Sequence, residues 1–223
     1  MNQGRTPTRA LSRVARDPLS RRRFFVLTGG TSAAAVLAAC GEDEESGSST
    51  STSSMTGTDD EMASQFGEGD LGIVNYALTL EYLEAGFYDA VAGSGLFKGA
   101  ELALVKQIGA AEQEHVDALI ATAKKLGGKP AAEPKAEFPL EDAKSVLELA
   151  ATVENLGAAA YLGQAGAIES PDVLAAALSI HSVEARHAAV LNVLIGEEPT
   201  PDGAFAEPAD MQTVLDEVQP FLA

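Results

Sequence analysis

The sequence predicts an all-α protein, a four-helix bundle with internal pseudo-symmetry. Each half of the chain carries a lone Glu on an apolar helical stripe, and a Glu-x-x-His pair follows 31 positions later in the first half and 30 in the second. The six residues are Glu81, Glu112 and His115, then Glu154, Glu184 and His187. A spacing of three places the Glu and His of a pair on one helix face. Because the repeat has only two units, we expect two similar helix pairs in one bundle and not a solenoid.

Both Glu-x-x-His pairs lie among apolar residues on their helix faces. The first pair shares its face with Val105, Ile108 and Leu119, and the second with Ala177, Ile180, Leu191 and Leu194. A carboxylate on a core-facing stripe costs several kcal/mol unless another group compensates for its burial. Because there are two such pairs, one common group could offset the cost of burying both carboxylates, and a metal centre is the natural candidate.

Residues 1–39 have the features of a targeting segment and are set apart from the fold. The segment 20–25 (SRRRFF) resembles a twin-arginine export signal, and the apolar run after it is too short for a stable membrane span. Leu37-Ala38-Ala39-Cys40 resembles a bacterial lipoprotein cleavage box, which implies lipidation of Cys40 and attachment to the outer face of the cell membrane. The alternative is an uncleaved N-terminal anchor with an incidental cysteine. Cys40 is the only cysteine, so an intramolecular disulfide is excluded.

Residues 40–65 begin with this cysteine and continue as an acidic Ser/Thr/Gly segment that we interpret as a flexible tether. Its reach is roughly 25–30 Å. Cleavage after residue 39 would remove seven of the 15 basic residues and one of the 33 acidic ones, leaving 8 against 32 and a formal charge of −24. Such a surface argues against nucleic acid and anionic lipid headgroups as partners. It serves solubility or raises the local cation concentration.

Capping residues and glycines define four expected helices within 66–197. They run from near Asp70 as N-cap to Gly93, from about 99 to 126, from 140 or 141 to 164–166, and from Ser170 as N-cap to near Gly196. Gly127-Gly128 ends the second helix, and Pro171 opens the fourth. The short connections make helices 1 and 2, and helices 3 and 4, antiparallel neighbours.

The link between the second and third helices decides the topology. Residues 127–139 number 13 and reach roughly 40–45 Å when extended, whereas a helix of about 26 residues is roughly 39 Å long. The link can therefore run the full length of the bundle, although length alone also permits a tight turn. Residues 198–223 are expected to form a strap with a short helix at about 210–218 that buries Phe205 and Phe221. A frayed end is the alternative.

Two lone Glu residues and two Glu-x-x-His motifs resemble the ligand inventory of the ferritin-like carboxylate-bridged dimetal proteins. Segments 75–84 (NYALTLEYLE) and 182–187 (SVEARH) are similar to bacterial ferritin-like proteins akin to plant desiccation-related proteins. The resemblance covers about residues 66–223. It implies a ferritin-like bundle over 66–197 with a long crossover between helices 2 and 3.

The resemblance also implies a centre of two Fe or two Mn ions, bridged by Glu112 and Glu184. Glu81 and His115 would complete one metal, and Glu154 and His187 the other. Glu84 lies one turn from Glu81, but its counterpart in the second half is Gly157, so we prefer Glu81 as the ligand. Three residues could form hydrogen bonds with the ligand side chains or simply pack in the core: Tyr88, Tyr161 and His181. The two tyrosines could also serve redox chemistry.

Three functions are open from the sequence. One is a redox centre that turns over peroxide or oxygen and protects the envelope under oxidative or drying stress. Another is metal binding or ferroxidase-type handling without a cage. The third is a structural, stress-protective protein in which metal only holds the bundle together. No residue is assigned as catalytic, and a small oxidant or a second copy of the chain in a homodimer is left open as a partner.

Overall fold

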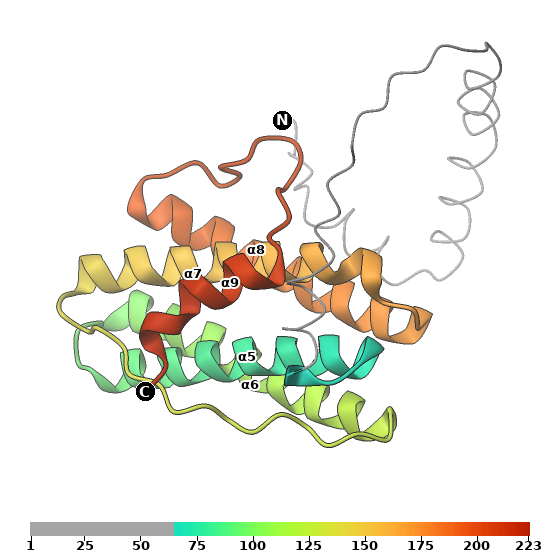
Figure 1. Ribbon diagram of the computed structural model, residues 1–223. Helices are drawn as coiled ribbons and strands as arrows, with labels where there is room; N and C mark the ends of the chain where they lie inside the picture. Colours follow the sequence, from blue (N-terminus) through green and yellow to red (C-terminus); the bar gives the residue numbers. More distant parts are fainter. Residues whose placement is uncertain (1–64) are drawn as a thin grey trace, which may run out of the picture. The chain divides into compact units, whose positions relative to one another are not determined.

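The computed structural model describes residues 65–223, which form a helical bundle (Figure 1). The α-helices are α5 (Gly69–Gly93), α6 (Gly99–Lys125), α7 (Ala143–Gln164), α8 (Pro171–Ile195) and α9 (Met211–Val218), with short 3-10 helices η1 (Ala165–Ala167) and η2 (Gln219–Phe221). The predicted all-α fold class is confirmed, since the described part of the chain contains no strand beyond one isolated bridge between Ala136 and Leu222. The predicted signal segment 1–39, the lipidation site Cys40 and residues 41–64 of the tether lie outside the described residues. Within residues 65–223, no helix combines the length and apolarity that crossing a membrane requires.

Local capping explains most helix boundaries. Ser170 accepts a hydrogen bond from the Val173 N–H at the start of α8, and Gly196 ends that helix in the left-handed region at φ 88°. Helix α7 begins two or three residues later than expected because Asp142 is its N-cap. The Asp142 side chain accepts hydrogen bonds from the backbone N–H groups of Lys144 and Ser145. In return, the Ser145 hydroxyl oxygen accepts a hydrogen bond from the Asp142 backbone N–H.

The prediction that Asp70 caps α5 is wrong. The N-cap is Glu68, which forms no side-chain capping bond, and Asp70 lies in the first turn. Its two carboxylate oxygens instead accept hydrogen bonds of 2.8 Å from the backbone N–H groups of Glu169 and Ser170. Asp70 therefore joins the start of α5 to the start of α8, a long-range contact that local sequence cannot show.

The crossover between α6 and α7 runs along α5, as the long link predicted (Figure 1). Near its start, the Ala131 N–H donates a 2.9 Å hydrogen bond to Asn75 Oδ1 in the first half of α5. Near its end, Phe138 packs edge-on against Phe87 in the second half of α5, with ring centroids 5.4 Å apart. The link thus returns the chain to the end of the bundle where α6 begins. Helix α7 therefore runs parallel to α6 and antiparallel to α5.

The C-terminal segment crosses the bundle as a strap. Val214 and Val218 of α9 are buried in one cluster with Leu80, Leu83 and Ala160 of α5 and α7. The last residues pair with the crossover, since Glu137 donates to the Phe221 carbonyl at 2.9 Å and Ala223 donates to the Lys135 carbonyl at 3.0 Å. Phe221 packs against this arrangement as expected.

Two predictions about buried apolar residues are wrong. Phe205 is 84% exposed, because residues 197–207 form an exposed excursion before α9. Leu194 is 47% exposed. The apolar face of α8 continues from Leu191 to Ile195, four residues on, and Ile195 packs against the core in its place.

Candidate metal centre

Six polar side chains from four helices converge in the interior of the bundle. They are Glu81 of α5, Glu112 and His115 of α6, Glu154 of α7, and Glu184 and His187 of α8. All four carboxylates are 0% exposed, and His115 is 9% exposed. The structure therefore brings together all six residues that the sequence pattern singled out.

The first ligand set surrounds His115. Its Nδ1 lies 2.8 Å from Glu112 Oε2, 3.0 Å from Glu184 Oε1 and 3.2 Å from Glu81 Oε2. One ring nitrogen carries at most one hydrogen, so it cannot donate to three carboxylate oxygens at once. The lone pairs of these oxygens therefore point at a common space, which is the arrangement that a cation needs.

The second ligand set surrounds His187. Its Nδ1 lies 2.8 Å from Glu112 Oε1 and 3.3 Å from Glu154 Oε2. Within each set, one ligand atom from each of four residues lies within 4.8 Å of the others. Glu112 and Glu184 belong to both sets, so the two sets are adjacent and share two carboxylates.

Two buried tyrosines hold the outer carboxylates across the bundle. The Tyr161 hydroxyl of α7 donates to Glu81 Oε1 of α5 at 2.6 Å, and the Tyr88 hydroxyl of α5 donates to Glu154 Oε1 of α7 at 2.5 Å. The two contacts are equivalent under the internal repeat. Their sequence signal was the equal spacing of seven residues between each lone Glu and its tyrosine, which by itself did not distinguish this contact from core packing.

His181 does not join the cluster. Its Nδ1 instead lies 3.0 Å from the carbonyl oxygen of Ala158 on α7. The two charged residues between the Glu and His of the motifs, Glu114 and Arg186, are exposed. Glu84 is buried, yet it belongs to neither ligand set.

Burial makes three of the acids, Glu81, Glu184 and Glu84, hold their protons more tightly than an exposed glutamate does, and repulsion from neighbouring carboxylates adds to the effect. Burial raises the pKa of Glu81 to about 7 and that of Glu184 to about 10. It also raises the pKa of Glu84 well above its ordinary value, and the charges of Glu184 and Glu81 add to the shift. For Glu112, the close imidazoles of His115 and His187 outweigh burial and lower the pKa.

The pKa values of the two histidines are raised although burial acts to lower them. Burial by itself lowers the pKa of His115, but the close carboxylates of Glu112, Glu184 and Glu81 outweigh it and raise the pKa to about 12. The close carboxylates of Glu112 and Glu154 likewise raise the pKa of His187 to about 9 against its burial. The cluster therefore holds protons when no cation is present, and a bound cation would take their place.

The unsatisfied atoms of the cluster fit a metal. Among residues 65–223, buried atoms without a hydrogen-bond partner include Glu112 Oε1, Glu154 Oε2, both oxygens of Glu184 and His187 Nδ1. Such atoms are costly in a protein interior unless something binds them. Apart from the Tyr76 hydroxyl, all such atoms belong to the two ligand sets, so the cluster can hold a metal ion.

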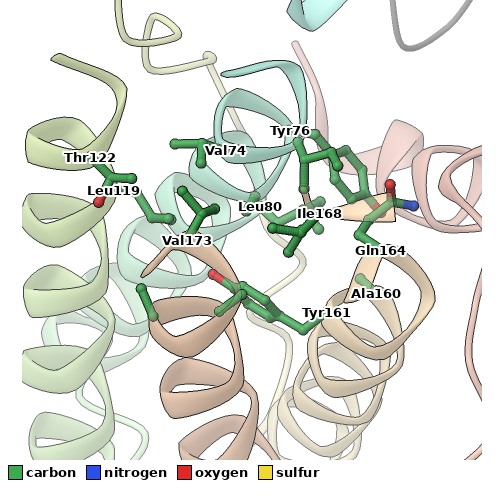
Figure 2. Close-up of a pocket in the computed structure, with 14 residues that line it drawn as sticks. Val74, Tyr76, Leu80, Leu119, Thr122, Ala160, Tyr161, Gln164, Ile168 and Val173 are labelled. Atoms are coloured by element: carbon green, nitrogen blue, oxygen red, sulfur yellow. The ribbon is translucent and has the colours of Figure 1, made fainter. Parts of the chain in front are cut away.

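An apolar cavity of about 30 Å³ lies beside the centre, between the N-terminal part of α5 and α8 (Figure 2). The ring of Tyr161 forms one wall, with Val74, Leu119 and Val173 among its other lining residues. Because the Tyr161 hydroxyl binds Glu81, this apolar space is separated from the ligand cluster by a single side chain.

The fold and the ligand cluster agree with a comparison with known families. Residues 69–197 match the family model of the ferritin-like domain, a stretch that starts at the first residue of α5 and ends just after α8. A comparison with curated proteins finds no match. Because the family match spans more than half of the 223 residues, the chain belongs to the ferritin-like domain family.

Proposed function

We propose that this protein binds a dinuclear Fe or Mn centre and uses it in redox chemistry on peroxide or oxygen, as a protectant against oxidative or desiccation stress. The observation that carries the proposal is the pair of adjacent ligand sets sharing Glu112 and Glu184. A single ion would leave one histidine and one outer carboxylate without a role. Mixed carboxylate and imidazole donors suit iron and manganese among the common protein metals.

In this proposal each residue has a defined part. Glu112 and Glu184 would be shared by the two ions, Glu81 and His115 would hold one of them, and Glu154 and His187 would hold the other. Tyr161 and Tyr88 fix the orientation of the outer carboxylates by donating to their second oxygens. The metal pair would supply the electrons that a peroxide or oxygen molecule accepts.

The surroundings favour a small, uncharged oxidant. The ligand carboxylates are fully buried, and the cavity next to Tyr161 is apolar and only about 30 Å³ in volume. Such a space excludes organic substrates of ordinary size. Peroxide and oxygen are small enough to enter it.

The proposal includes export and lipid attachment through Cys40. Its support is the sequence of residues 1–40, where a basic start, an SRRRFF motif and an apolar run precede Leu37-Ala38-Ala39-Cys40. An acidic tether to residue 65 would then hold the bundle just outside the membrane. Placement outside the cytoplasm suits a role in protecting the cell envelope, and membership of the desiccation-related group is part of the same proposal.

A second candidate is a stress-protective protein whose metal is structural. Each of the four long helices contributes at least one ligand, so a bound metal pair would tie all four together. Metal would then raise stability without turnover of any oxidant. The two candidates share the site and differ in its chemistry.

Metal content of the purified protein, measured by elemental mass spectrometry, tests the proposal. We expect close to two Fe or Mn ions per chain in the wild type and a loss of both in the Glu112→Ala/Glu184→Ala double variant. Turnover of hydrogen peroxide by the loaded wild type would then favour the redox function over the structural one. Absence of metal after reconstitution with either ion would refute the dinuclear centre.

A further inference from the structure

Glu84 is a fifth acid at the centre, and neither ligand set uses it. It lies on α5 one helical turn after Glu81 and is only 3% exposed. Among residues 65–223, no donor forms a hydrogen bond with its carboxyl group. Packing alone does not explain such a residue, because burying a carboxyl group costs several kcal/mol unless another group compensates for it.

The internal repeat places Glu84 at the pseudo-two-fold axis of the bundle. Helices α5 and α7 run antiparallel, and Tyr161–Glu81 and Tyr88–Glu154 are the two symmetry-equivalent contacts between them. Glu84 lies between Glu81 and Tyr88, and its counterpart Gly157 lies between Glu154 and Tyr161. Equivalent residues midway between two equivalent contacts face each other across the axis.

Gly157 provides the space that the Glu84 carboxyl group occupies. A Cβ atom at residue 157 would lie 2.6 Å from Glu84 Oε1, closer than real Cβ contacts come, and 3.5 Å from Glu184 Oε2. An oxygen of Glu84 and an oxygen of the shared ligand Glu184 therefore face the same small space. A side chain at residue 157 would have to displace the end of Glu84, so Gly157 leaves room for the Glu84 carboxyl group at the point where the repeat is broken.

The outer side of this space offers Glu84 only hydrocarbon. Val214 and Val218 of the strap helix α9 cover it, and with side chains of α5 and α7 they line a cavity of about 20 Å³ beside Glu84 and Gly157. Apart from Glu84 itself, the residues lining this cavity are apolar or glycine. On its inner side, Glu84 lies beside the ligand carboxylates, and Glu184 borders the same space at Gly157.

We propose that Glu84 is a seventh ligand, a carboxylate that reaches the metal pair from the pseudo-two-fold axis between α5 and α7. The inference rests on the proposed function, since it requires the dinuclear centre. An added anionic ligand would tighten the binding of both ions, because it stands near both sets. It would also favour the more highly charged, oxidised state of the pair.

Two substitutions in the full chain test this role from opposite directions. Glu84→Gln keeps the shape of the side chain and removes its negative charge. Gly157→Ala keeps Glu84 but fills the space that its carboxyl group occupies. We expect each to weaken Mn²⁺ binding by about tenfold or more in calorimetric titration, and to change the electron paramagnetic resonance spectrum of bound Mn²⁺. Glu114→Gln, which removes the same charge from an exposed position on α6, should leave both readouts unchanged.

Thermal melting of the metal-free proteins checks that each variant is folded. A folded Glu84→Gln protein with wild-type Mn²⁺ affinity and spectrum would overturn the seventh-ligand role and leave the proposed centre intact. Failure of the wild type itself to bind Mn²⁺ or Fe²⁺ would overturn the proposed function and this inference together.

Discussion

The hydroxyl group of Tyr161 on α7 donates a 2.6 Å hydrogen bond to Glu81 Oε1 on α5, across 80 positions of the sequence. Glu81 thereby presents its other oxygen, Oε2, toward His115 at 3.2 Å. A carboxylate that is held by one oxygen has a fixed direction for the other. The tyrosine therefore positions a proposed ligand without itself touching the ion.

Removal of this hydroxyl group should weaken metal binding. Tyr161→Phe frees Glu81 to rotate, and we expect metal affinity to fall by roughly 10-fold to 100-fold, as for other groups that orient ligands. The stoichiometry should stay at the wild-type value. Calorimetric titration with Mn²⁺ measures both quantities.

Tyr82→Phe is the matched control, because Tyr82 lies on the same helix as Glu81 but is partly exposed. Its metal affinity should equal that of the wild type. Equal affinities for Tyr161→Phe and Tyr82→Phe would contradict a positioning role for the Tyr161 hydroxyl group.

The metal-free protein should become less stable as the pH rises from about 5 to 9. The pKa of Glu184 is raised from 4.5 to about 10 and that of His115 from 6.5 to about 12, so the folded state keeps protons that the unfolded chain has released. Each such proton lowers the free energy of unfolding by about 1.4 kcal/mol per pH unit. Melting temperatures measured in chelator across this range should fall steadily.

The affinity of the protein for metal should increase over the same pH range. The cation replaces the protons on the cluster, so metal binding releases protons and strengthens as the pH rises. Titrations in buffers of different ionisation enthalpy would count the protons released. A metal-free melting temperature that increases between pH 5 and 9 would contradict the assigned pKa directions.

The helices and the ligand set were predictable because their signals are local and periodic. Gly127 and Gly196 end their helices where the sequence indicated, and the Glu-x-x-His spacing places its two side chains on one face whatever the tertiary context. The role of Asp70 was not predictable, because its partners lie about 100 positions away. Likewise, the exchange of Glu84 for Gly157 only gains a meaning once α5 and α7 face each other at the axis.

Asn75 should be essential for anchoring the crossover. Its side chain accepts from the Ala131 N–H at 2.9 Å and donates to the carbonyl oxygens of Phe66 and Lys129. Asn75→Leu would leave three partly buried backbone groups without a partner, at a cost of roughly 2–4 kcal/mol in the free energy of unfolding. Denaturant unfolding measures the loss, and proteolysis within residues 127–139 should become faster.

The matched control is Asn155→Leu on α7, where the side chain faces Asn192 on α8 and not the crossover. This change should also destabilise the fold, yet it should leave the proteolysis rate of the crossover at the wild-type value. Equal cleavage rates in both variants would show that Asn75 does not hold the crossover specifically.

The strap should depend on a single glycine of α7. An added Cβ atom at Gly163 would clash with the carbonyl oxygen of Ala209, and the N–H of Ala209 donates to the Ala159 carbonyl at 3.0 Å. The added methyl group belongs to the α7 backbone and would meet the backbone of Ala209, and neither can move aside like a side chain. Gly163→Ala therefore forces the chain before α9 away from α7. We expect the burial of Val214 to be lost and the melting temperature to fall, with a destabilisation of roughly 2–4 kcal/mol from the exposed apolar surface.

Gly166→Ala is the control, since nothing lies within 4 Å of a Cβ atom there. That protein should melt within a degree or two of the wild type, given the small effect of exposed substitutions. Hydrogen exchange would localise the difference, with faster exchange of the α9 amides in Gly163→Ala alone. Unchanged protection of α9 in Gly163→Ala would mean that the strap tolerates displacement at Ala209. The packing of α9 over Glu84 would then not depend on the close approach of Gly163 and Ala209.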